Sequence, residues 1–138
     1  GNPPACPRAV NDADLPHLVI GACMSVHRTL GPGLTREAYE ECLAIELREL
    51  EFDFERQVPL AFDYRGKRVK TSAQLDFVVD GVLLLQVRAQ EALTKLEEEQ
   101  FESLFKLSKL RTGLLVNFNV LTLRKGIRQI MRKRREVS

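Results

Sequence analysis

The chain has 138 residues, of which 44% are apolar and 29% are charged, so it is long enough for one globular domain with its own hydrophobic core. Its three cysteines are an odd number without a CxxC spacing, which argues against a disulfide framework and against a structural zinc site. No apolar run approaches the roughly 20 residues that span a bilayer, and no leader pattern is present, so we expect a cytoplasmic protein without a membrane partner.

The formal net charge of +2 hides an uneven distribution of charge. Residues 121–138 contain seven Lys and Arg residues against Glu136, which is +6 locally and leaves −4 for the rest of the chain. A basic end of this kind binds phosphates or an acidic partner surface, although a solvated helix face is an equal alternative. We expect an irregular arm over 1–11, a single domain over 12–131 and a basic tail over 132–138.

The first part of the chain predicts two helices. Asp14 followed by Pro16 is typical of a helix start, because an acid favours the positive end of a helix and proline fits its first turn. Apolar residues at helical spacing then continue to a Gly-Pro-Gly stop signal at 31–33. Thr35 is a suitable N-cap for a second helix that runs to about residue 50.

Beyond the second helix, the apolar period changes from helical to alternating. This alternation predicts strands within 54–62 and 73–79. Asp80-Gly81 fits a tight hairpin turn, and it leads into a third strand over 82–88. The unbroken Val-Leu-Leu-Leu run of this strand indicates burial on both faces, as at the centre of a sheet.

The last part of the chain predicts a crossover and a final helix. A helix over about 93–110 and a strand over 113–118 complete a parallel crossover from the third strand. A basic amphipathic helix is expected from about Leu123, with Ile127, Ile130 and Met131 on its inner face. The predicted fold class is therefore α/β, with a mixed central sheet of about four strands flanked by helices in the order ααβββαβα.

Six segments of the sequence carry a family resemblance. They are VHRTLGPGL (26–34), Tyr39-Glu40, ERQVPLAFDYRGK (55–67), LDFVV (75–79), Gln100 and GLLVNFNV (113–120). In this order and spacing they resemble the bacterial GxxExxY proteins of the PD-(D/E)XK nuclease-like superfamily, over about residues 15–131. The resemblance implies a restriction-endonuclease-like core. In an active member it also implies converging carboxylates that hold Mg²⁺, which polarises the scissile phosphate and activates a water.

The resemblance places a vestigial site on Arg36, Asp76, Gln86, Arg88 and Gln100. The family's helix glutamate falls on Arg36, and its strand aspartate is kept as Asp76. The Glu and the Lys of Glu-x-Lys fall on Gln86 and Arg88, and the next helix keeps Gln100. A cation and a neutral amide thus replace two of the three acidic ligands, and Arg, unlike Lys, does not give up its proton. Such a site repels Mg²⁺, so we expect no catalytic residues and no cofactor.

Two further positions of the family pattern bear on the same site. The motif tyrosine is kept as Tyr39, whereas the tyrosine that is common four residues after Gln100 is replaced by Leu104. Glu37 is adjacent to Arg36, but one helical step of about 100° points its side chain elsewhere.

Each candidate residue also has a purely structural alternative. Asp76 paired with Arg88 or Arg36 across a strand end is one, and Gln86 and Arg88 facing solvent is another. The remaining alternatives are His27 as a hydrogen-bonded structural residue, Asn117 and Asn119 as loop caps, and Tyr39 packed against the first helix.

These observations favour a catalytically degenerate nuclease fold that acts as a binding or self-assembly module. The candidate anion-binding residues are Arg36, Arg88, Arg128 and Arg132. A homo-oligomer or a protein partner is expected, because a compact domain freed from catalysis can keep its fold through symmetric contacts.

Two other functions stay open. The first is an active Mg²⁺-dependent nuclease that uses Asp76, Gln86 and a replacement acid such as Glu40. The second is a nucleic-acid-binding protein that does not cleave and that contacts phosphates through its basic tail. The absence of tryptophan and the low aromatic content weaken any platform for stacking single-stranded bases.

Overall fold

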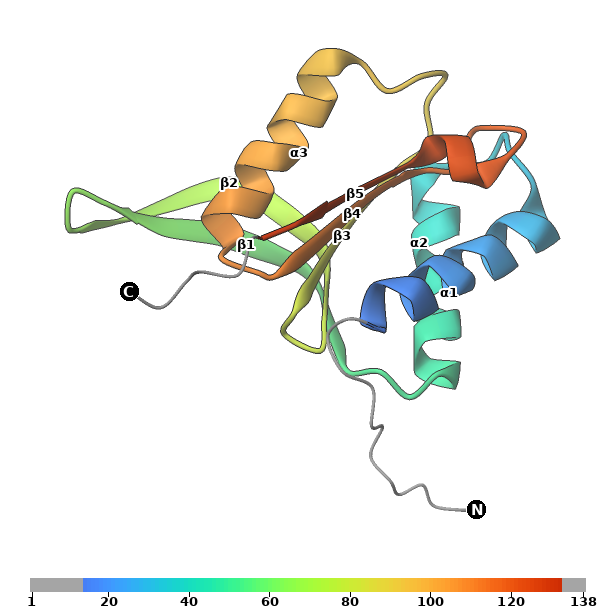
Figure 1. Ribbon diagram of the computed structural model, residues 1–138, viewed down its shortest axis with the longest axis horizontal. Coiled ribbons are helices and arrows are strands. Elements are labelled where there is room, and N and C mark those ends of the chain that lie inside the picture. Colours follow the sequence, from blue (N-terminus) through green and yellow to red (C-terminus); the bar gives the residue numbers. More distant parts are fainter. Residues whose placement is uncertain (1–13, 133–138) are drawn as a thin grey trace.

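The computed structural model describes residues 14–132 as a sheet with helices on both faces (Figure 1). The elements are α1 (Leu15–Leu30), α2 (Arg36–Glu49), β1 (Phe54–Tyr64), β2 (Lys67–Val79), β3 (Leu83–Arg88), α3 (Lys95–Ser108), β4 (Thr112–Asn117), the 3₁₀ helix η1 (Leu123–Gly126) and β5 (Ile127–Met131). The arm predicted over 1–11 lies outside the described residues, as does the tail predicted over 132–138 except for Arg132.

Both N-terminal helices begin and end as the sequence predicts. Helix α1 has a proline in its first turn and ends at Gly31, whose φ of 69° is in the region that glycine tolerates without strain. The Thr35 hydroxyl oxygen accepts a hydrogen bond from the backbone N–H of Ala38 at 3.2 Å, so it caps α2. In the described residues, neither these helices nor any other is long and apolar enough to cross a bilayer.

The five strands lie in chain order across the sheet, β1-β2-β3-β4-β5. Strands β3 and β4 are parallel and are joined through α3, whereas the other three neighbouring pairs are antiparallel. The turn between β2 and β3 has positive φ at both Asp80 and Gly81, as in the tight hairpin turn expected there. The predicted mixed sheet flanked by helices is therefore confirmed.

The sheet separates two apolar cores, one on each face. Helices α1 and α2 cover one core, to which β3 contributes Leu83, Leu85 and Val87. Helix α3 covers the other, to which the same strand contributes Leu84 between them. Strand β3 is thus buried on both faces, as its continuous apolar run predicts. Its polar residues, Gln86 and Arg88, lie at the carboxyl end of this central strand.

The predicted C-terminal helix is wrong, and the sheet has five strands rather than about four. After the single turn of η1, β5 pairs antiparallel with β4, with Ile127 opposite Val116. Gly126 allows this close approach, because a Cβ at that position would overlap the backbone carbonyl oxygen of Asn117. Met131, expected on the inner face of a helix, is instead 56% exposed at the edge of the sheet.

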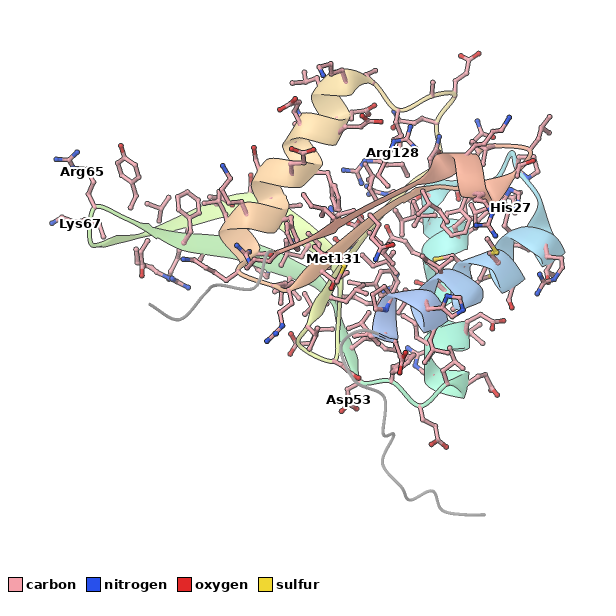
Figure 2. All side chains as sticks on the ribbon, viewed as in Figure 1. His27, Asp53, Arg65, Lys67, Arg128 and Met131 are labelled. Carbon is pink, nitrogen blue, oxygen red and sulfur yellow. The ribbon has the colours of Figure 1, made fainter. Side chains whose placement is uncertain are left out.

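The β1–β2 hairpin extends well past the other strands (Figure 1). Strand β2 pairs with β3 only through the three residues that end at Val79, while its pairing with β1 continues to Tyr64 and Lys67. Arg65 and Lys67 lie at the tip, directed away from the sheet (Figure 2). The hairpin therefore presents basic side chains at a distance from the end of β3.

Candidate functional site

The site lies where β2 and β3 separate. The regular pairing of these strands stops at Phe77 and Leu85, and two side chains continue it. The backbone N–H of Asp76 donates to Gln86 Oε1 at 2.6 Å, and the backbone N–H of Val87 donates to Asp76 Oδ2 at 2.9 Å. Both side chains are buried, so these bonds satisfy backbone donors that water does not reach. The alternative in which Gln86 faces solvent is wrong.

Arg88 is the cationic partner of Asp76. Its Nη1 lies 3.5 Å from Asp76 Oδ2 and donates to the carbonyl oxygen of Val87 at 2.8 Å. The Asp76 side chain is almost fully buried, whereas the Arg88 side chain is about a quarter exposed. The structure therefore shows the pairing of Asp76 with Arg88 that was one of the structural alternatives, and it assigns Arg36 to a different carboxylate.

A second buried carboxylate, Glu40, lies near Asp76. Its Oε1 accepts hydrogen bonds from Arg56 Nη2 at 3.3 Å and from Gln57 Nε2 at 3.2 Å. Its Oε2 lies 3.4 Å from Arg36 Nε one helical turn earlier, within ion-pair distance, but this geometry does not make a hydrogen bond. Arg56 also donates to the exposed Glu41 at 3.0 Å. Glu40 thus joins α2 to β1 from inside the protein.

Burial raises the pKa of the Glu40 carboxyl above its ordinary value, and the negative charge of Asp76 raises it further. Its hydrogen bond to Arg56 and the charges of Arg36 and Arg56 act in the opposite direction without cancelling these effects. The two carboxylates are therefore close enough to repel each other, and the arginines around them provide the compensating charge.

The raised pKa of Glu40 predicts a pH dependence of stability. A carboxyl with a higher pKa in the folded state binds more protons than it does when unfolded, so folding becomes more favourable as the pH falls. We expect the wild type to gain stability relative to Glu40→Gln between the raised folded pKa and the unfolded value near 4.5. Urea unfolding of both proteins over this pH range measures the difference; a constant difference would contradict the assignment.

The donor set does not fit Mg²⁺. Two carboxylates, Glu40 and Asp76, lie among three guanidinium groups, those of Arg36, Arg56 and Arg88. No group of three or more His, Cys, Asp or Glu side chains within residues 14–132 is arranged to hold a metal ion. A hard dication prefers several oxygen ligands that carry negative charge, and here the cations of the chain already pair with them.

Of the five residues of the predicted site, Gln86, Arg88 and Gln100 line one groove, whereas Arg36 and Asp76 are not among its lining residues. The groove has a volume of about 540 Å³ and lies between α3 and strands β1 to β3. Its lining side chains are Leu60, Ala73, Gln74, Gln86, Arg88, Leu96, Glu99, Gln100, Phe101, Ser103, Leu104 and Leu107. Most of this surface is apolar. Leu104, which stands where the family commonly has a tyrosine, is one of the apolar residues that line the groove.

The four candidate anion-binding arginines all have partners within the chain. Arg36 pairs with Glu40 and Arg88 with Asp76, and Arg128 Nε donates to Glu98 Oε2 at 2.7 Å. Arg132 donates to the carbonyl oxygens of Leu110, Phe105 and Lys106 near the end of α3. Arg128 lies on β5 and Arg132 directly follows it, rather than on the expected helix.

The remaining candidates serve the structure. His27 Nε2 lies 2.7 Å from the carbonyl oxygen of Val120, a hydrogen bond that joins α1 to the segment before η1. The Asn117 amide bonds both backbone groups of Gln90, so it caps the loop after β3 as expected. Tyr39 stacks on Phe118, with ring centroids 4.6 Å apart, and its hydroxyl donates to the carbonyl oxygen of Gly31. Its contacts therefore include residues outside the first helix.

The fold defines a class of protein, an α/β domain with a mixed five-stranded sheet flanked by helices. A family model described as the PD-(D/E)XK nuclease superfamily matches residues 13–130. The chain belongs to this superfamily, and the match covers most of its length. Searches of curated proteins and of solved structures found no match.

Proposed function

We propose that this protein is a catalytically degenerate member of its superfamily that works as a binding or self-assembly module. The single observation that carries the proposal is the pairing of both buried carboxylates with arginines. Asp76 pairs with Arg88, and Glu40 lies within 3.4 Å of both Arg36 and Arg56. The family pattern makes Asp76 a metal ligand, and the nuclease alternative uses Glu40 as a replacement acid; here guanidinium groups contact both carboxylates.

The hydrogen bonds of Gln86 support the same proposal. Its amide accepts from the N–H of Asp76 and its Nε2 lies 3.5 Å from the carbonyl oxygen of Gln74, so both ends of the side chain face backbone groups of β2. A carboxylate in this place would put an oxygen against the Gln74 carbonyl, where only a donor is favourable. Gln86 therefore suits a strand-bridging role better than a role as metal ligand.

The proposal predicts that the protein cleaves neither single- nor double-stranded DNA or RNA in Mg²⁺ or Mn²⁺. An assay with each substrate measures this, and Asp76→Ala prepared in the same way controls for a contaminating nuclease. Cleavage that disappears in Asp76→Ala would overturn the proposal in favour of an active nuclease.

Light scattering then distinguishes self-assembly from binding to another partner, since a closed oligomer shows a multiple of the chain mass and a partner-binding monomer does not.

A non-cleaving nucleic-acid-binding protein is the second candidate, and the hairpin favours it. Residues 63–70 contain four adjacent or near-adjacent basic residues and one acid, Asp63, which pairs with Arg68. Arg68 also lines a cavity of about 390 Å³ with Lys106 and Lys109 at the end of α3. A basic two-stranded ribbon of this kind fits the major groove of DNA. A mass that rises when nucleic acid is added, and falls back in salt, would support this candidate.

A further inference from the structure

The groove between α3 and the sheet is polar at one end and apolar at the other. Strand β3 runs toward Arg88, and α3 then returns along it because the two elements belong to one crossover. Gln86, Arg88 and Gln100 therefore lie at the end where α3 begins, together with the rim residue Leu96. Leu104 and Leu107 lie one and two turns further along α3, facing Leu60 of β1.

Arg88 has hydrogen-bonding capacity left at the polar end. Its contact with Asp76 is 3.5 Å, which is long for a charge-assisted hydrogen bond, and it uses Nη1 alone. Within residues 14–132, its Nε and Nη2 make no hydrogen bond. The nearby Glu97 carboxylate is held by Gln90 and by its cap with Thr94, so it does not occupy these donors.

Uncommitted amides accompany this cation. The side chains of Gln74 and Gln100 line the groove and make no hydrogen bond within the part of the chain that the structure describes. Glu99 also lines the groove, and Asp76 and Glu97 lie near Arg88, so carboxylates outnumber the one arginine of the lining. Their repulsion grows with the charge of a bound anion, so it acts more strongly against a multiply charged phosphate than against a monoanion that the forked donors of Arg88 hold.

The dimensions of the groove fit a small ligand. A volume of about 540 Å³ is within the usual range for ligand pockets. From Gln100 to Leu107 the helix rises by about 10 Å, which is the length that an apolar body would follow. Burial of an alkyl chain there is favourable because it removes apolar surface from water.

We propose that this groove binds a small amphipathic monocarboxylate, with the carboxylate on Arg88 and Gln100 and the apolar body against Leu60, Leu104 and Leu107. This inference rests on the proposed function, because it requires a site that a metal ion does not use. The two departures from the family pattern at positions 88 and 104 then serve one purpose. Arg88 provides a forked donor for a carboxylate, and Leu104 provides an apolar wall.

The test is a titration of the isotope-labelled protein with octanoate, followed by amide chemical shifts. We expect saturable shifts confined to the end of β3 and to α3, and at least tenfold weaker binding of 1-octanol and of inorganic phosphate. Arg88→Gln and Leu104→Tyr should each weaken octanoate binding at least tenfold, the first through the headgroup and the second by filling the groove. Lys67→Gln, an exposed cation at the hairpin tip, is the matched control and should bind as the wild type does.

Equal affinity for octanoate and octanol, or an unchanged affinity in both groove variants, would overturn the inference. So would the absence of saturable shifts in the wild type. Because Leu104→Tyr keeps the Asp76–Arg88 pair, it remains informative if Arg88→Gln fails to fold. A failure here leaves the nuclease assay unaffected, whereas cleavage in that assay contradicts the proposed function itself, so the two failures are distinguishable.

Discussion

Glu40→Ala is expected to destabilise the protein by about 2 kcal/mol, since it leaves Arg56 Nη2 and Gln57 Nε2 without their acceptor inside the protein. The substitution removes the acceptor of Arg56 and Gln57 and leaves a cavity between α2 and β1. The Glu40→Gln isostere should cost much less, because it keeps an acceptor oxygen and the raised pKa of Glu40 shows that burial penalises its charge. Urea unfolding at neutral pH measures these differences in the free energy of unfolding.

Glu41→Ala is the matched control for this effect. Glu41 follows Glu40 in α2 and contacts the same arginine at 3.0 Å, but its side chain is 71% exposed. Because exposed ion pairs contribute little, we expect a loss below about 1 kcal/mol. If Glu41→Ala cost as much as Glu40→Ala, the buried network would not be what joins α2 to the sheet.

Much of the fold could be predicted because its signals are local. Thr35 marks the start of α2 and Asp80-Gly81 marks a hairpin, and each depends only on neighbouring residues. The last strand could not be predicted in this way. The spacing of Ile127 and Ile130 suits a helix face, but an unpaired edge of β4 lies close to it, and Gly126 allows the chain to reach that edge. Long-range pairing therefore decided the structure there.

The family pattern selected five positions for the site, and three of them, Gln86, Arg88 and Gln100, line one groove, but the pattern predicted neither the groove nor the charge balance around it. The nuclease alternative combined Glu40 with Asp76, but nothing in the sequence indicated that Glu40 would pair with Arg56 and Gln57 of β1, sixteen and seventeen residues away. One signal was present in the sequence: Arg36 and Glu40 are four residues apart, the spacing at which helical side chains pair.

If arginines have replaced a metal ion, restoring the acids should restore metal binding. The variant Arg36→Glu/Gln86→Glu/Arg88→Lys returns the family's acids and lysine at positions 36, 86 and 88 and adds two carboxylates to Glu40 and Asp76. We expect this variant to be less stable than the wild type without metal, because four acids then lie close together. Millimolar Mn²⁺ should stabilise it, by about 1.4 kcal/mol at ten times its dissociation constant.

Thermal unfolding in MnCl₂ and in NaCl of matched ionic strength measures this response, since the difference between the two salts isolates binding from screening. The wild type should unfold at the same temperature in both salts. Arg36→Gln/Arg88→Gln removes the two cations without adding carboxylates, and it should respond less than the triple variant. A wild-type protein stabilised specifically by Mn²⁺ would show that Asp76 and Glu40 hold a metal ion despite their arginines. In that case the active nuclease, with Glu40 as the replacement acid, would be the better account of this site.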